Sequence, residues 1–350
     1  MGGPGGAQVI MKSDPKRQLK QFKQYLQNIK RLRAATIDKY LRTVAEFLAW
    51  REVHGLTALF ASLEPVALRR EVEEYLGSCR EHGNGNMTLR LKLTAIKSLF
   101  AGLVWGDVII SNPTSRIACL PRSPVLLRGA PLSRDEILAM FKQIDITREK
   151  GLRDAVLLIL GVFAGLRLNE IISLNIDDVR NKERGKLLEL HVTNFEKKSK
   201  RLVSLWEAPS KIVRSLIAAR MGTGARMGDP VLVSYEKNGR PRRGNRRLTL
   251  GAADNIVKQL AGLAGIQRTT INTRLLRTTH VHDLLRCRCY DEYQVADRLG
   301  WKRLESLFAY IPKKNARNKF ESLPDYWSGF QDIWSTKKDL TADGGTADRS

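Results

Sequence analysis

The stretch that decides the fold runs from Leu152 to Val179 and reads LRDAVLLILGVFAGLRLNEIISLNIDDV. Its apolar part, Ala155 to Leu166, is shorter than the ~20 residues of a bilayer span and predicts a buried helix. The helix ends near Gly165, and Arg167 follows at once, close to Glu170. Burying an unpaired guanidinium is costly, so Arg167 should pair with a carboxylate or face an anion.

Helical patterns lie on both sides of this stretch. A capping box at Ser133–Glu136 starts the helix before it. After it, the β-rich segments 187–192 and 201–205 flank a lysine-rich turn and predict a hairpin. Helices resume near Lys211 and continue to about Tyr310. These elements predict a mainly α domain with a small β-hairpin or sheet.

The first ~110 residues predict a separate all-helical unit, because apolar residues recur there at helical spacing. Four prolines between Pro113 and Pro131 then predict an extended linker. The predicted organisation is a flexible N-terminus (1–14), a helical DNA-binding domain (15–112), the linker (113–131), a catalytic domain (132–325) and a tail (326–350).

The charge balance points to a polyanionic partner. The chain carries 60 Lys and Arg against 36 Asp and Glu, a formal net charge of +24. Basic positions on the predicted N-terminal helices are either phosphate contacts or a solvated face, and a basic loop at 237–247 has no acidic residue. The candidate DNA-binding residues are Lys30, Arg31, Arg33, Arg90, Lys92, Lys97, Arg240, Arg242, Arg243, Arg246 and Arg247.

The chain lacks the sequence motifs of several other classes of protein. The pair His280-x-His282 has no HExxH context, Cys287-x-Cys289 lacks the spacing of a zinc site, and no phosphate-binding loop of the GxxxxGK[ST] type occurs. We therefore expect neither a metal site nor an ATP site. The Gly-rich start has no basic region followed by an apolar one, so we expect a cytoplasmic, nucleoid-associated protein without a membrane partner.

Four motifs occur in order in the second half of the chain. Arg167 is followed by Arg274-Leu-Leu-Arg277, by Leu299-Gly300-Trp301, and by Tyr310 nine residues after Trp301. In this order and spacing the chain resembles the tyrosine recombinases, the phage-integrase and Xer-like family of site-specific DNA recombinases. The first half is similar to the helical core-binding (SAM-like) domain of that family, which precedes an α+β catalytic domain.

The resemblance implies a role for each matching residue. Tyr310 would be the nucleophile, and Arg167 and Arg277 would bind the scissile phosphate. Trp301 would donate its indole N–H to that phosphate, although a packed core tryptophan is the alternative. Arg274 stands where most members have His or Lys, and it can donate to a phosphate but cannot act as a base.

Three further assignments stay open at the level of sequence. The family has a catalytic lysine in the β-hairpin, and both Lys197 and Lys198 fit, with Lys197 slightly favoured by its distance from the following strand. Glu170 either orients Arg167 or is simply solvated. The aromatic stretch from Phe320 to Trp334 either docks on a neighbouring protomer or packs in cis, and the residues after Ser335 are expected to be disordered.

The resemblance implies a DNA strand-transferase that cuts and rejoins DNA through a 3′-phosphotyrosine and a Holliday junction, without ATP, metal or other cofactor. It also implies double-stranded DNA with a specific core site, a homotetrameric synapse, a role in DNA integration by a mobile genetic element, and accessory DNA-bending proteins of unknown identity. The alternatives are a DNA-binding relative that has lost cleavage and a type IB topoisomerase.

Overall fold

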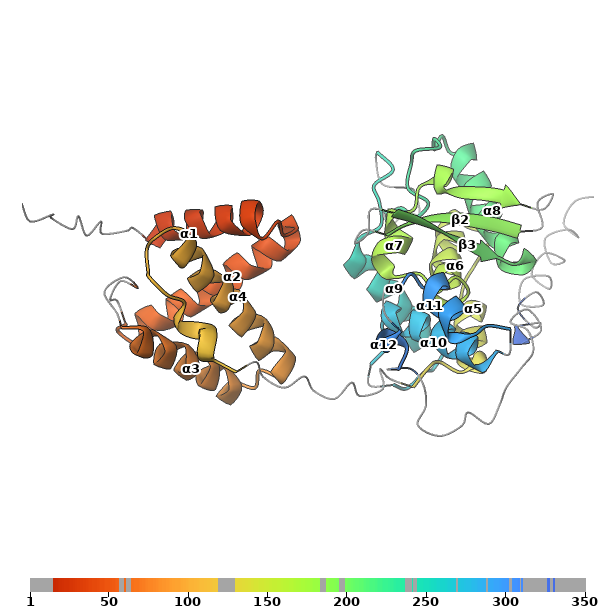
Figure 1. Cartoon of the computed structure of the whole chain (residues 1–350). Coiled ribbons are helices and arrows are strands. Elements are labelled where there is room, and N and C mark those ends of the chain that lie inside the picture. Colours follow the sequence, from red (N-terminus) through yellow and green to blue (C-terminus); the bar gives the residue numbers. More distant parts are fainter. Residues whose placement is uncertain are drawn as a thin grey trace, which may run out of the picture. The chain divides into compact units, whose positions relative to one another are not determined.

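The computed structural model describes residues 15–56, 60, 64–118, 130–182, 187–194, 199–236, 241, 244–268, 270–287, 289–301, 304–308, 310, 326, 327 and 330. The chain forms two compact units, residues 1–125 and 126–350 (Figure 1). The predicted N-terminus (1–14) and the tail after residue 330 lie outside the described residues. In the described ranges, no helix combines the length and apolar character needed to cross a membrane.

The first unit is all-helical in its described part, as the sequence predicts. Its helices are α1 (Pro15–Gln24), the π-helical turn η1 (Tyr25–Ile29), α2 (Ala34–Val53), α3 (Pro65–Glu81), α4 (Asn86–Trp105) and the 3-10 helix η3 (Pro113–Arg116).

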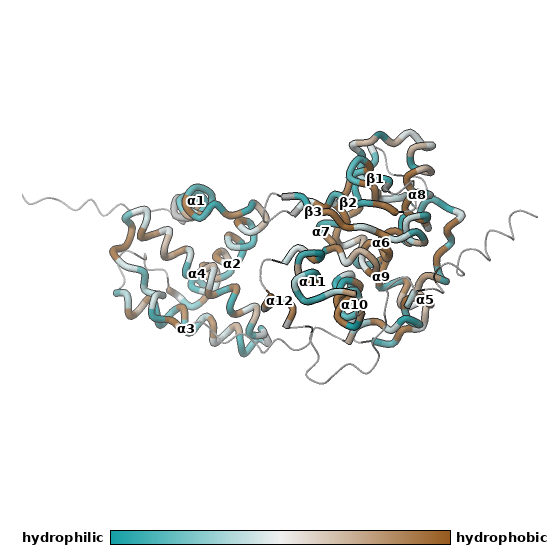
Figure 2. The backbone as a smooth tube through the Cα atoms, turned by 45° about the vertical axis from the view of Figure 1, so that its right-hand side comes forward, coloured by the Kyte–Doolittle hydropathy of each residue, from teal (hydrophilic) through white to brown (hydrophobic). Residues whose placement is uncertain are grey.

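The apolar faces of these helices meet in one core. Helix α4 packs closely on α1 and η1 at Gly102, where an added Cβ would stand 3.2 Å from the Tyr25 ring and 3.3 Å from the Phe22 ring. The α1 tube is largely hydrophilic along its length (Figure 2), because its sequence PKRQLKQFKQ places only Leu19 and Phe22 among polar residues. The predicted linker begins at Pro113, yet Ile117 is buried in this core, so the segment through Ile117 packs with the first unit.

The second unit combines helices with one sheet. Its elements are α5 (Arg134–Lys142), α6 (Glu149–Val162), α7 (Leu168–Ser173), η4 (Ile176–Asp178), β1 (Val179–Lys182), β2 (Leu187–Asn194), β3 (Ser199–Leu205), α8 (Glu207–Gly222), α9 (Leu250–Leu263), α10 (Thr273–Arg286), α11 (Glu292–Arg298) and α12 (Glu305–Phe308). The predicted capping box is present, since Ser133 and Glu136 exchange side-chain and backbone hydrogen bonds at the start of α5.

The predicted hairpin is part of a three-stranded antiparallel sheet in the order β1-β2-β3. The sheet lies at one end of the unit, and α10, α11 and α12 lie toward the other (Figure 1). Val192 pairs with Arg201 across β2 and β3. Because side chains alternate along a strand, Arg201 lies on the same face as the buried residues Val203 and Leu205.

Helix α6 is the centre of this unit, and every residue from Ala155 to Val162 is buried. An added Cβ on Gly161 would stand 2.7 Å from the Cβ of Leu276, so the glycine allows α6 and α10 to pack closely. Phe163, just after α6, packs edge-on against the rings of Trp327 and Phe330. At these two residues the predicted C-terminal tail is therefore part of the second unit's core, packed in cis.

Candidate active site

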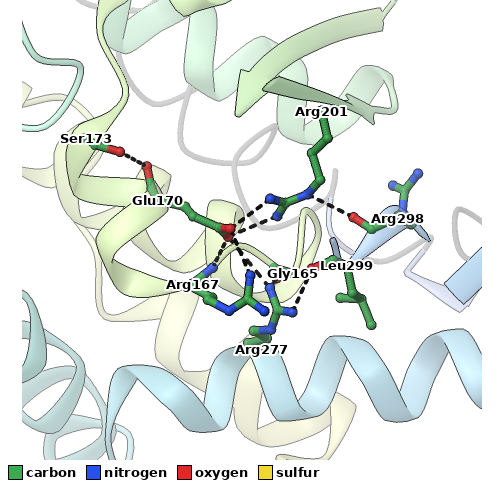
Figure 3. Close-up of polar contacts among 8 residues, drawn as sticks. All are labelled: Gly165, Arg167, Glu170, Ser173, Arg201, Arg277, Arg298 and Leu299. Carbon is green, nitrogen blue, oxygen red and sulfur yellow. Dashed lines mark hydrogen bonds and ion pairs between the residues drawn. The ribbon is translucent and has the colours of Figure 1, made fainter. Parts of the chain in front are cut away.

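A turn after α6 positions Arg167. Gly165 has φ +61°, and an added Cβ there would lie 2.2 Å from the ring of the buried residue His280. Only glycine fits both the left-handed backbone and this close approach. The chain then enters α7 with Arg167 at its N-cap, which directs the guanidinium to the side where α10 passes (Figure 3).

The carboxylate of Glu170 is the common acceptor of this site. It accepts hydrogen bonds from the Arg167 backbone N–H at 2.7 Å and from Arg167 Nη1 at 3.0 Å. It also accepts two from Arg201, at 2.7 Å from Nη1 and 2.9 Å from Nη2 (Figure 3). Arg277 Nη1 lies 3.7 Å from it. Burial alone would raise the pKa of Glu170, but the Arg201 bonds and charge, with those of Arg167 and Arg277, lower it.

Arg277 is held from two sides in the interior. Its Nη1 donates to the carbonyl of Gly165 at 2.6 Å, and its Nη2 donates to the carbonyl of Leu299 at 2.9 Å. Burial, together with the charges of Arg167 and Arg201, lowers the pKa of Arg277 to about 9, which leaves it charged at neutral pH. Each Nη carries a second N–H, so two fixed carbonyl bonds orient the guanidinium without using all of its donors.

Trp301 lies between the ring of Tyr310 and the guanidinium of Arg277 in a series of contacts. The two rings stack with centroids 5.4 Å apart at 26°, and the Arg277 guanidinium carbon lies 5.6 Å from the Trp301 ring centroid. The Tyr310 side chain is buried, and His282 meets it edge-on at 6.0 Å. The electrostatic influence of Tyr310 raises the pKa of Arg277, opposing the effect of burial. The arrangement places a phenol beside a fixed cation.

The remaining predicted site residues are less closely tied to this cluster. Arg274 is exposed on α10, one turn before Arg277, so the two lie on neighbouring positions of one helix. The candidate hairpin lysines, Lys197 and Lys198, lie outside the described residues.

The predicted DNA-binding residues divide into exposed and internally bonded ones. Lys30, Arg31, Arg33 and Arg246 are exposed, and Arg90 is half-buried. Lys92 pairs with Glu46 at 2.5 Å and with the Tyr75 hydroxyl at 3.0 Å. Lys97 donates to the carbonyl of Ile117 at 2.7 Å. Three of the loop arginines lie outside the described residues, namely Arg240, Arg242 and Arg243.

Arg247 has an internal role in the structure. Its guanidinium donates to the carbonyls of Ile172 and Leu174 and to the side chain of Asn175. It therefore holds the end of α7 against the segment that follows, and burial lowers its pKa.

Sequence reasoning missed Arg201, although a signal was present. In the segment RLVSL the alternation puts Arg201 on the apolar face, where an arginine needs a partner. Its side chain is 13% exposed and its partner is Glu170. Glu170 itself has a side chain that is 4% exposed, which excludes the alternative that it is simply solvated.

No candidate metal site of three or more His, Cys, Asp or Glu side chains is found among the described residues. His280 is buried with its Nδ1 2.8 Å from the carbonyl of Val162, and burial lowers its pKa to about 3, so it is a neutral core residue. The site thus contains a fixed group of guanidiniums and a tyrosine ring stacked on Trp301, which suits an anionic substrate.

Tyrosine recombinases are among the curated proteins that the chain resembles. Tyrosine recombinase XerC of Bacillus subtilis is 28% identical over 161 residues, 46% of this chain and 51% of XerC. XerD of Oceanobacillus iheyensis is 24% identical over 295 residues, 82% of this chain and 91% of XerD. In most of these matches the chain spans about half the length of the curated relative.

The fold has counterparts among solved structures. A lambda integrase dimer bound to a COC′ core site superposes with a TM-score of 0.62 at 14% identity, covering 87% of this chain and 98% of its counterpart. The N-terminal SAM-like domain of phage integrases matches residues 19–106, and the phage integrase family matches residues 131–317, more than half of the chain. The chain therefore belongs to the phage integrase family, that of the tyrosine recombinases.

Proposed function

We propose that this protein is a site-specific tyrosine recombinase that cuts and rejoins DNA through a 3′-phosphotyrosine intermediate. The observation that supports the proposal is the series of contacts from Tyr310 to Trp301 to Arg277, because it connects the ring of the proposed nucleophile to a buried cation that can bind a phosphate. Attack of the Tyr310 oxygen on phosphorus forms the phosphotyrosine bond and breaks the bond to the 5′ oxygen of the next nucleotide. The reverse attack by a 5′-hydroxyl reseals a strand, so bond energy is retained in the adduct.

The roles of the other residues follow from charge. Negative charge grows on the non-bridging oxygens in the transition state, and Arg167 and Arg277 stabilise it there. Arg274, one turn from Arg277, adds a donor, and Trp301 positions the ring of Tyr310. We assign the proton for the departing 5′ oxygen to a hairpin lysine, Lys197 or Lys198. No ATP, metal or other cofactor is needed for this exchange.

The substrate and assembly follow from relatives of the same fold. XerH has been solved bound to its difH substrate, and lambda integrase as a tetramer bound to a Holliday junction. We propose that this chain likewise acts on double-stranded DNA with a specific core site, as a homotetramer that synapses two sites, at the nucleoid of the cytoplasm. The exposed residues Lys30, Arg31, Arg33 and Arg246 are the proposed backbone contacts.

A trapped adduct tests the proposal. Nicked duplexes are built from the repeats that adjoin the gene, so that cleavage releases a short fragment and the protein–DNA adduct accumulates. We expect a wild-type adduct that survives SDS and disappears with protease, and none from Tyr310→Phe at unchanged affinity in a gel shift. Tyr290→Phe is the matched control, because Tyr290 packs against the same apolar cluster.

The adduct assay and a plasmid relaxation assay distinguish the two alternatives. A DNA-binding relative without cleavage would shift the duplex and form no adduct. A type IB topoisomerase would relax a supercoiled plasmid that has no paired sites, whereas we expect no relaxation without such sites.

A further inference from the structure

Arg201 connects three segments of the active site by fixed hydrogen bonds. Its two Nη atoms bind the two carboxylate oxygens of Glu170 at 2.7 and 2.9 Å, and its Nε donates to the carbonyl of Arg298 at 3.2 Å. Strand β3, the cap of α7 and the end of α11 therefore meet at one guanidinium (Figure 3). This geometry requires the planar fork of arginine, which lysine cannot reproduce.

The contact at the end of α11 reaches toward Trp301. Leu299, next to Arg298, supplies the carbonyl that holds Arg277. Gly300 has φ +65°, and an added Cβ there would stand 3.1 Å from Arg201 Nη1. The turn that leads into Trp301 therefore rests directly on the Arg201 side chain.

Charge balance gives Arg201 a second effect. The described part of the site holds the guanidiniums of Arg167, Arg201 and Arg277 near the one carboxylate of Glu170. The two hydrogen bonds from Arg201 neutralise much of the negative charge of that carboxylate. The positive charge of Arg167 and Arg277 is therefore available to a phosphate. Without Arg201, Glu170 would neutralise more of that charge.

We propose that Arg201 is a positioning residue of the recombination reaction. The inference rests on the proposed function. Arg201 keeps Glu170 ionised and in place, and through it holds Arg167. Because Arg201 sits on β3 and pairs there with Val192 of β2, it also ties the register of these two strands to the proposed phosphate-binding arginines. It does not itself contact the reacting atoms.

Substitution with a matched control tests the inference. Arg201→Gln removes the charge and the bidentate pair, and Arg201→Lys keeps only the charge. Lys200→Gln is the control, because Lys200 is the next residue of β3 and pairs with Asp178, away from Glu170. On the nicked substrate we expect single-turnover cleavage to fall about 10²-fold in Arg201→Gln and about 10-fold in Arg201→Lys. Lys200→Gln should stay within about twofold, and DNA affinity within about threefold, in all of them.

The pH profile separates positioning from a merely structural role. Without Arg201 the effect of burial is less opposed and the pKa of Glu170 rises, so Glu170 is protonated at higher pH than in wild type and its bonds to Arg167 weaken there. We expect the acid limb of the cleavage rate to move to higher pH in Arg201→Gln. In Arg201→Gln with Glu170→Gln this limb should disappear, because no titrating group is left at the position.

The double variant also covers the case in which Arg201→Gln does not fold, since it removes the buried unpaired carboxylate. Its cleavage should remain about 10²-fold below wild type and close to that of Glu170→Gln alone, because the two residues act as one unit. The inference is overturned if Arg201→Gln cleaves within twofold of wild type, or if its loss follows affinity at every pH without movement of the acid limb. Absence of an adduct from wild type and Lys200→Gln would instead overturn the proposed function, and this inference with it.

Discussion

Each unit buries an arginine–glutamate ion pair, and the two pairs differ in how many cations surround the carboxylate. In the first unit Arg51 Nε binds Glu71 at 2.7 Å, with both side chains at most 10% exposed, and the guanidinium lies 4.4 Å from the Phe60 ring centroid. The pair connects α2 to α3. In the second unit Glu170 is surrounded by three arginines.

The difference separates a structural ion pair from the proposed phosphate-binding site. One arginine and one glutamate cancel, so the pair in the first unit has little field left to attract an anion. An arginine cluster with one carboxylate keeps a net positive charge in a place of low dielectric, where it acts strongly on a phosphate. A buried arginine alone therefore does not distinguish a structural ion pair from an anion-binding site. The number of arginines for each carboxylate distinguishes them.

The largest difference in cleavage rate should appear when the arginine of each pair is replaced by lysine. Arg277→Lys loses the two carbonyl bonds and the bidentate donor, so we expect cleavage of the nicked substrate to fall by about 10²–10³-fold. Arg51→Lys should cleave within about twofold of wild type, because its pair lies in the other unit. Equal losses in the two variants, measured by single-turnover cleavage at saturating protein, would contradict the distinction.

The next effect concerns stability. Glu71→Gln leaves the buried guanidinium of Arg51 without its counter-charge, which should destabilise the first unit by about 3 kcal/mol. Hydrogen exchange read by mass spectrometry checks this, since amides of α2 and α3 should exchange faster while those of α6 do not change. Protection of α2 and α3 equal to wild type would show that the pair adds nothing to folding.

The sequence predicts the helices, the hairpin and the order of the site residues because each depends on local periodicity or on spacing. It predicts Tyr310 and Trp301 on one segment for the same reason. It did not predict β1, whose residues VRNK have no alternating apolar pattern and pair only because β2 lies beside them.

The role of Glu170 was left open by sequence because its partners come from distant positions. Arg201 lies 31 residues away and Arg277 on another helix, so only the folded chain shows how many cations one carboxylate meets. The internal bonds of Lys97 and Arg247 were not predicted either, since nothing local distinguishes a lysine or arginine that points inward from one that points to solvent.

A third carboxylate extends the comparison to pH. Asp283 on α10 is 4% exposed, and burial raises its pKa to about 7, against the opposing effects of Arg286 and of a hydrogen bond with Trp327. The folded protein thus binds a proton that the unfolded chain releases, and stability falls as pH rises from about 4 to about 7. Glu170, whose pKa is lowered, acts with the opposite sign and loses its contribution as pH falls.

Asp283→Asn should remove this slope. We expect the variant to be more stable than wild type by a few kcal/mol at pH 8 and similar near pH 4, because the amide has no proton to lose. Urea unfolding at a series of pH values measures the difference in the free energy of unfolding. Tryptophan fluorescence is a suitable probe, because Trp327 is buried. A difference between the two proteins that does not change with pH would contradict the assignment.

The smallest effect distinguishes two lysines of the first unit that sequence treats alike. Lys97 donates to the carbonyl of Ile117, whereas the side chain of Lys30 is exposed at the end of η1. A lysine that neutralises a phosphate releases counterions, and removing it lowers the salt dependence of DNA binding by about one contact. We therefore expect Lys30→Gln to reduce the slope of log affinity against log salt by about 0.9 between ~50 and ~200 mM, and Lys97→Gln to leave the slope unchanged. If both variants reduced it equally, the hydrogen bond to Ile117 would have to open when DNA binds, and internal bonding would no longer separate structural lysines from DNA contacts.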